Sequence, residues 1–272
     1  MSLIVAALLV SLAFVGSIIG VRWLETAIAF HPEHYDGGTE WDLPTRARDV
    51  QFKTVDGLSL HGWYFEPERG PAKATIIYFH GNGGNISNVG WVGQHLSSRG
   101  FAVLLFDYRG YGRSEGKIDG EQGIYNDADA AYRFATQMGG PVVLYGQSLG
   151  TTAVADLAMR EKCSAVILES GFSSASDLAS TLLPWFPRPL HVLLQNRFES
   201  AKKLRNVHVP ILITHGDPDP VIPTAESRKL FAAANEPKKL LIFPGAGHNV
   251  FGSVGPRYLD QVSEFIESSL PK

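Results

Sequence analysis

Short, uninterrupted apolar runs alternate along this chain with stretches that suit α-helices. The apolar runs are residues 74–79, 101–106, 142–145, 165–168, 211–214 and 240–243. The helix-compatible stretches are residues 86–99, 120–137, 149–161, 224–234 and 256–270. Strands that are apolar on both faces are typical of a parallel sheet that helices cover on both sides. We therefore expect an α/β fold with a mostly parallel central sheet.

The region before these runs predicts an antiparallel edge to the sheet. Residues 50–55 and 58–65 are β-like, and Asp56-Gly57 between them is a strong signal for a two-residue hairpin turn. With no internal repeat or long charged linker, residues 48–272 are expected to form one domain. Residues 171–200 interrupt the alternation with Ser, Pro and aromatic residues, so we expect a short cap-like insertion there.

The first thirty residues differ from the rest. Residues 3–21 carry no charge and are about as long as the roughly 20 apolar residues needed to cross a bilayer. Arg22 and Trp23 follow, as an interfacial cation and aromatic would. We expect a single-pass membrane anchor at residues 1–30, on an undetermined side, followed by a linker at 31–47. A cleaved signal peptide, with a small-residue site at 27–29, and a buried helix of a soluble protein are the alternatives.

Composition excludes several classes of function. Lys and Arg number 24 against 27 Asp and Glu, a formal net charge of −3, which does not suggest a nucleic-acid partner. The single cysteine, Cys163, excludes an internal disulfide framework and a cysteine-based metal cluster. Because Cys163 adjoins an apolar run, we expect a buried small side chain and not a nucleophile.

A candidate nucleophile, Ser148, lies where an apolar run meets a helical stretch. Residues 146–150 read Gly-Gln-Ser-Leu-Gly, which matches the G-x-S-x-G pattern. The preceding strand and following helix supply the context in which this pattern forms a sharp turn that exposes the serine hydroxyl. The start of the helix also favours negative charge that develops nearby. A chance Gly-Ser-Gly turn is the alternative.

A serine hydroxyl needs a base that is in turn oriented by a carboxylate. In this topology the chain order is serine, acid, histidine. His248 follows the last apolar run in a glycine-rich loop and is the predicted base. Asp219 and Asp217 both follow the 211–214 run; the His-Gly-x-x-Asp spacing favours Asp219, and Asp217 remains the alternative. We expect His215 to brace the acid loop.

The segment after residues 74–79 reads His-Gly-Asn-Gly-Gly-Asn. A glycine-rich loop in this place can direct a backbone N–H toward the reacting carbonyl. We expect the N–H groups of Asn82 and Leu149 to form an oxyanion hole. A phosphate-binding loop is the alternative, although neither common phosphate-loop pattern occurs here.

Together these residues resemble the α/β-hydrolases, in particular the membrane-anchored serine hydrolases of the ABHD type and their bacterial relatives. The resemblance covers roughly residues 30–272. The motifs that carry it are Phe-His-Pro at 30–32, Asp56-Gly57, Leu-His-Gly-Trp at 60–63, His-Gly-Asn at 80–82, Asp-Tyr-Arg-Gly-Tyr-Gly-Arg-Ser at 107–114, the 146–150 elbow, residues 215–219 and Gly247-His248. One feature departs: eukaryotic depalmitoylases of this type attach through an N-terminal cysteine cluster, which this chain lacks.

The resemblance implies an α/β-hydrolase fold, with Ser148, Asp219 and His248 as the catalytic triad and Asn82 and Leu149 as the oxyanion hole. It implies that Asp107 and Arg109 organise their loop and do no chemistry. The expected reaction is hydrolysis of carboxylic esters or thioesters of small-molecule, lipid-like or acylated-protein substrates through an acyl-enzyme, with no cofactor and no metal. A serine peptidase and a non-catalytic scaffold are the alternatives.

Overall fold

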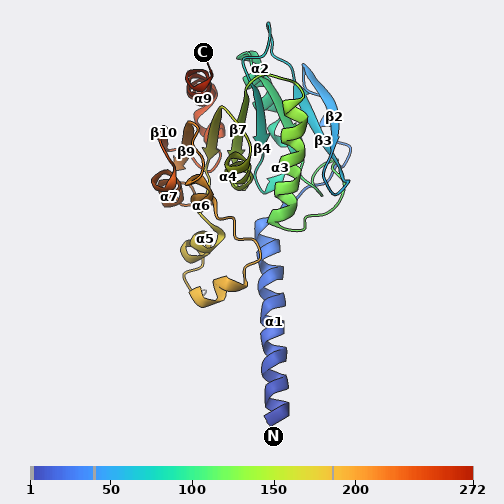
Figure 1. Ribbon diagram of the computed structural model, residues 1–272, viewed down its shortest axis with the longest axis vertical. Coiled ribbons are helices and arrows are strands. Elements are labelled where there is room, and N and C mark those ends of the chain that lie inside the picture. Colours follow the sequence, from blue (N-terminus) through green and yellow to red (C-terminus); the bar gives the residue numbers. More distant parts are fainter. Residues whose placement is uncertain (1–2, 39–40, 186, 272) are drawn as a thin grey trace.

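The computed structural model describes residues 3–38, 41–185 and 187–271, and its centre is an eight-stranded sheet (Figure 1). The strand order is β10-β9-β8-β7-β4-β6-β3-β2. Their bounds are β2 Ala47–Lys53, β3 Ser59–Phe65, β4 Thr75–Phe79, β6 Ala102–Phe106, β7 Val142–Gln147, β8 Ala165–Glu169, β9 Ile211–Asp217 and β10 Lys238–Pro244. Strand β3 pairs in antiparallel fashion with β2 and with β6, and the other pairs of described strands in this sheet are parallel.

Helices cover both faces of this sheet. On one face lie α2 (Gly90–Ser98) and α9 (Pro256–Ser269), with the short η2 (Ile86–Val89) and α8 (Val250–Val254) beside them. On the other lie α3 (Glu121–Thr136), α4 (Gly150–Arg160), α6 (Ser200–Leu204) and α7 (Ala225–Ala233). Every residue of β4, β6 and β8 is buried, which explains why these strands are apolar without alternation. The predicted mostly parallel α/β fold and its antiparallel edge are confirmed.

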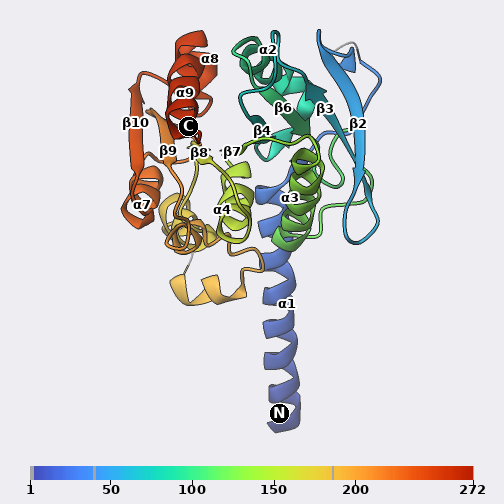
Figure 2. The same cartoon turned by 45° about the horizontal axis from the view of Figure 1, so that its top comes forward.

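The N-terminal helix α1 (Leu3–Ala29) projects from the domain, as Figures 1 and 2 show. Among the residues that the structure describes, no helix has the length and apolar character needed to cross a bilayer. The predicted membrane anchor at residues 1–30, and the membrane localisation and membrane partner inferred from it, are therefore wrong. The charged Arg22 and Glu25 lie within the helix, and the Glu25 carboxylate is bonded to backbone N–H groups of the domain.

The segment that follows α1 is joined to the domain beside the glycine-rich loop. Strand β1 (His31–Pro32) pairs in parallel with β5 (Gly83–Gly84), and the N–H of His31 donates to the carbonyl of Asn82 at 2.9 Å. Phe30, just before β1, is buried in the core. The end of α1 is thus held next to the loop that carries Asn82.

Residues 171–200 form two short helical segments, α5 (Ala175–Leu182) and η3 (Arg188–Leu193), which lie alongside the upper part of α1 in Figure 1. Trp185, an aromatic residue of this segment, is 71% exposed. Phe186, the aromatic residue next to it, lies outside the described residues.

Cys163 is partly buried and packs against the core, in agreement with its predicted structural role. Burial raises the pKa of its thiol to about 12, which keeps it protonated at neutral pH. Since the thiolate is the reactive form, this side chain is a poor nucleophile.

Candidate active site

Ser148 lies at the turn between β7 and α4 and has a strained backbone. Its φ is 53°, in the left-handed region that residues with a side chain rarely adopt. Two backbone hydrogen bonds hold the turn: the Ser148 N–H donates to the Glu169 carbonyl at 2.8 Å, and the Thr151 N–H donates to the Ser148 carbonyl at 3.0 Å. The conformation is the one that the 146–150 pattern predicts.

The glycines at both ends of this turn are required by close approach of the backbone. A Cβ atom on Gly146 would lie 2.6 Å from the carbonyl of Gly150. A Cβ on Gly150 would lie 2.0 Å from the carbonyl oxygen of Phe79, at the end of β4. The pattern therefore reflects the packing of α4 directly against the ends of two strands.

His248 is hydrogen-bonded to Asp219 in the loops that follow β10 and β9. Its Nδ1 lies 2.7 Å from Asp219 Oδ2. Because an ionised carboxylate only accepts, Nδ1 is the donor, which leaves Nε2 as the basic nitrogen of the neutral ring. The Asp219 side chain is fully buried and that of His248 is 19% exposed.

The Asp219 carboxylate accepts hydrogen bonds on both oxygens. Oδ1 accepts from the N–H groups of Val221 and Ile222 at 2.7 and 3.0 Å, and His215 Nε2 lies 3.0 Å from Oδ2. Burial raises the pKa of Asp219, but the bonds from His215, His248 and these two N–H groups outweigh it and lower the pKa below its usual value. Asp219 is therefore held ionised.

The two aspartates that the sequence left open occupy different places. Asp217 is exposed, and its Oδ1 lies 3.5 Å from the hydroxyl of Thr224. His215 is buried and also contacts the Ser227 hydroxyl and the Ile222 carbonyl. The structure thus brings His248 to Asp219, and places His215 as a brace of the acid loop.

The two expected oxyanion donors border one cavity together with Ser148. Within the part of the chain that the structure describes, the backbone N–H groups of Asn82 and Leu149 donate to no acceptor. Leu149 immediately precedes α4, whose N-terminal dipole favours negative charge at this point. Both N–H groups are therefore available to a bound oxyanion.

The loop at residues 107–114 is hydrogen-bonded to the glycine-rich loop at residues 80–85, which carries Asn82. The Tyr111 hydroxyl donates to the carbonyl of Asn82 at 2.9 Å, and the Tyr108 hydroxyl donates to that of His80 at 3.2 Å. The carboxylate of Asp107 accepts from the N–H of Ile86 at 2.9 Å, beyond the same loop. These bonds explain how residues remote from the serine shape its surroundings.

Arg109 anchors that loop through an ion-pair network in which the pair with Asp127 is buried. Its guanidinium donates to Asp127 at 2.8 and 3.0 Å and to Asp56 and Asp119 at 2.9 Å, and the Arg109 and Asp127 side chains are 2% and 0% exposed. We expect Arg109→Met to lower the free energy of unfolding by about 3–5 kcal/mol, because Asp127 would be left buried without its cation. Urea denaturation measures the change.

The matched control for this prediction is the double variant Arg109→Met/Asp127→Leu, which removes both charges. It should be more stable than the single variant. A single variant within 1 kcal/mol of the wild type would contradict a structural role for Arg109.

Sequence reasoning missed Glu169 and Ser170, which connect the nucleophile to the base. The Ser170 hydroxyl donates to the His248 carbonyl at 2.8 Å, and the buried carboxylate of Glu169 accepts from the N–H of Val250 at 3.2 Å. The backbone carbonyl of Glu169 also accepts the N–H of Ser148. The end of β8 is therefore hydrogen-bonded both to the turn that carries Ser148 and to the loop that carries His248. The sequence signal that could have found these two residues is the apolar run at 165–168. The carboxyl ends of neighbouring parallel strands meet at one edge of the sheet, so residues that follow this run lie near those that follow β7.

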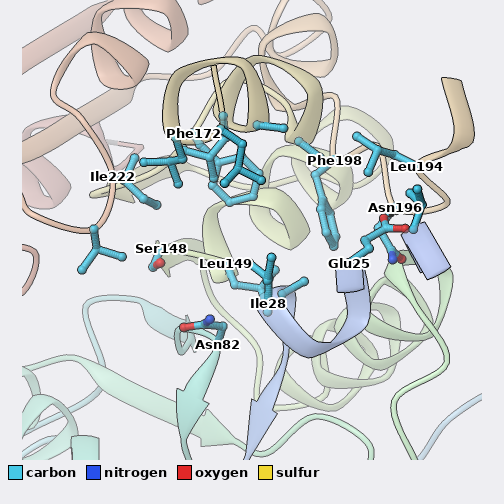
Figure 3. A pocket seen from close by; sticks show the side chains of 18 residues that line it. Glu25, Ile28, Asn82, Ser148, Leu149, Phe172, Leu194, Asn196, Phe198 and Ile222 are labelled. Atoms are coloured by element: carbon cyan, nitrogen blue, oxygen red, sulfur yellow. Dashed lines mark hydrogen bonds between the residues drawn. The ribbon is translucent and has the colours of Figure 1, made fainter. Parts of the chain in front are cut away.

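The cavity beside Ser148 has a volume of about 270 Å³ and a mainly apolar lining (Figure 3). In that view Ser148 and Asn82 lie at one side, and Glu25, Leu194 and Asn196 lie at the other. The lining residues are Val21, Glu25, Ile28, Ala29, Asn82, Ser148, Leu149, Phe172, Ala175, Leu178, Ala179, Leu182, Leu183, Leu194, Asn196, Phe198, Val221 and Ile222. Among the described residues, no group of three or more His, Cys, Asp or Glu side chains is placed to hold a metal ion.

Comparisons with known proteins agree with this architecture. The chain is 35% identical to the uncharacterized protein YfhR of Escherichia coli (strain K12) over 240 residues, which cover 84% of this chain and 83% of the relative. It is 34% identical to alpha/beta hydrolase domain-containing protein 17B of Xenopus laevis over 253 residues, 86% of this chain and 85% of that protein. Among solved structures, the Pyrococcus furiosus esterase Pf2001 superposes with a TM-score of 0.72 at 20% identity, covering 89% of this chain and 98% of the other.

A sequence family matches the region that contains the site. The family Hydrolase_4, described as serine aminopeptidase S33, matches residues 70–203 and 190–253. These two segments include the 80–85 loop, the 146–150 elbow, Asp219 and His248. The chain therefore belongs to the Hydrolase_4 family, within the α/β-hydrolase superfamily.

Proposed function

We propose that this protein is a serine hydrolase that cleaves carboxylic ester or thioester bonds of acyl or lipid-like substrates through an acyl-enzyme intermediate. The observation that carries the proposal is that a strained serine borders an apolar cavity together with two backbone N–H groups that donate to no described residue. The hydrogen-bonded His248 and Asp219 supply the base that such a serine needs.

The proposed reaction begins when His248 Nε2 takes the proton of Ser148 as its Oγ attacks the carbonyl carbon. The carbonyl oxygen becomes an oxyanion, which the N–H groups of Asn82 and Leu149 stabilise. By comparison with measured deletions of such donors, each contributes about 2.7–4 kcal/mol. The leaving alcohol or thiol takes the proton from His248. Water, activated by the same histidine, then attacks the acyl-serine and releases the acid.

The family description suggests a peptidase as the second candidate. An aminopeptidase has to hold the ammonium group of its substrate, which calls for a carboxylate in the cavity. Among the lining residues the carboxylate is Glu25, and both of its oxygens already accept backbone N–H groups. The cavity therefore favours an apolar acyl group over a charged amino terminus.

The experiment that tests the proposal is labelling with a fluorophosphonate, alongside turnover of p-nitrophenyl esters and of aminoacyl and prolyl p-nitroanilides. We expect one label per chain, located on Ser148 by mass spectrometry, and faster turnover of the esters. Preferred turnover of the anilides would support the peptidase. Folded protein that neither reacts with the probe nor turns over any substrate would contradict the proposal and favour a non-catalytic scaffold.

A further inference from the structure

The cavity beside Ser148 has walls from segments that are far apart in the sequence. The α5–η3 region contributes Leu178, Leu182 and Leu183, as a cap over such a site would. The opposite wall is the end of α1, where Val21, Glu25, Ile28 and Ala29 line the same cavity. Ile28 and Leu149 both line this cavity, and in Figure 3 Glu25 lies at the side far from Ser148. Helix α1 is therefore part of the cavity that adjoins the serine.

The end of α1 is held in this position by contacts on both sides of the cavity. Toward the reacting groups, Phe30 is buried, its ring packs edge-on against Phe198, and His31 is bonded to Asn82. At the far side, the Glu25 carboxylate accepts the N–H groups of Gln195 and Asn196 at 2.9 and 2.6 Å. These bonds join α1 to the loop after η3, and Glu25 and Asn196 both line the cavity.

We infer that α1 forms the outer wall of an acyl-binding site that accepts one unbranched acyl chain; this rests on the proposed function. The cavity extends from Ser148 toward Glu25 and its lining is mainly apolar, which suits an alkyl chain.

The position of Ile28 allows the wall to be changed without disturbing the core. Ile28 is 52% exposed, so a larger or charged side chain there creates no buried clash. Each buried methylene contributes about fourfold to binding, so loss of contact with two or three of them costs at least about tenfold. The acetyl group has one methyl carbon beyond its carbonyl, so acetate esters should respond far less.

The test compares Ile28→Trp and Ile28→Asp with Ile19→Trp, a variant of the same helix at a 63% exposed residue that does not line the cavity. The wild type is expected to turn over p-nitrophenyl octanoate faster than the acetate. At least one Ile28 variant should lower kcat/KM for the octanoate by tenfold or more and leave the acetate within about twofold. Ile19→Trp should change neither substrate.

Binding of octanoate to Ser148→Ala protein, measured by calorimetry, separates this inference from the proposed function. If no ester is turned over, the proposed function fails, yet octanoate binding that Ile28→Asp weakens by about tenfold still supports the α1 wall. Octanoate turnover and binding that neither Ile28 variant changes would overturn the inference. Equal loss for octanoate and acetate would overturn it as well, since α1 would then act on the catalytic groups.

Discussion

Replacing Ser148 with alanine is expected to lower kcat for ester hydrolysis by about 10⁴- to 10⁶-fold. The reason is that the acyl-enzyme cannot form without the hydroxyl, while the Asn82 and Leu149 N–H groups and the cavity remain. KM should therefore change little. The residual rate over water reports what the oxyanion donors and substrate binding contribute on their own. Hydrolysis of p-nitrophenyl octanoate at substrate saturation measures the effect.

The control for this prediction is Ser98→Ala, which removes an exposed hydroxyl at the end of α2. It should retain wild-type activity. The Ser148→Ala variant should unfold at a temperature close to that of the wild type, since the substitution removes one hydroxyl and leaves the backbone turn in place. Activity of Ser148→Ala within tenfold of the wild type would exclude this serine as the nucleophile.

Replacing Asp219 with asparagine is expected to lower kcat by about 10⁴-fold, because the amide no longer fixes the His248 tautomer or stabilises its charged form. Asp217→Asn is the matched control and should leave kcat within about twofold, since Asp217 is exposed. Steady-state ester hydrolysis by the two variants distinguishes the two aspartates. The reverse order of effects would assign the acid to Asp217.

The lowered pKa of Asp219 predicts how this carboxylate responds to pH. Its ionised form is favoured in the folded protein, so its contribution to stability is present above the pKa of an unfolded aspartate, about 3.9, and is lost as the pH falls through the lower folded value. Asp219 should therefore stay ionised between pH 7 and pH 5, and activity lost in this range should not come from its protonation. In Asp219→Asn, that acid-side loss of the residual activity should persist.

Much of the architecture followed from local pattern. Strands buried on both faces have to be apolar throughout, so β4, β6 and β8 could be located from residue type alone. The hairpin of β2 and β3 was equally visible, because a two-residue turn needs a residue such as Gly57 that accepts a positive φ, here 88°. The turn at 146–150 could be located because it follows an apolar strand and has glycines where the backbone approaches closely.

The N-terminal helix shows where local pattern failed. An apolar run of anchor length was read as a membrane segment, whereas the described chain has no helix suited to span a bilayer and the end of α1 lines the cavity. Apolar residues are favoured both in a bilayer and against a protein surface, because both exclude water. The sequence of one chain does not distinguish these two environments. The role of Glu25 could not be predicted from the sequence either, because its hydrogen-bond partners are backbone N–H groups at residues 195 and 196.

The sequence by itself determined the order of strands and helices, the family resemblance, and Ser148 and His248 as candidates, because each depends on residues that are neighbours in the chain. Only the tertiary structure brought Asp219 and not Asp217 to His248, joined Ser148 to His248 through Glu169 and Ser170, and placed α1 against the cavity. Those contacts join residues far apart in sequence. They are set by how strand ends and loops pack in space, which local periodicity does not encode.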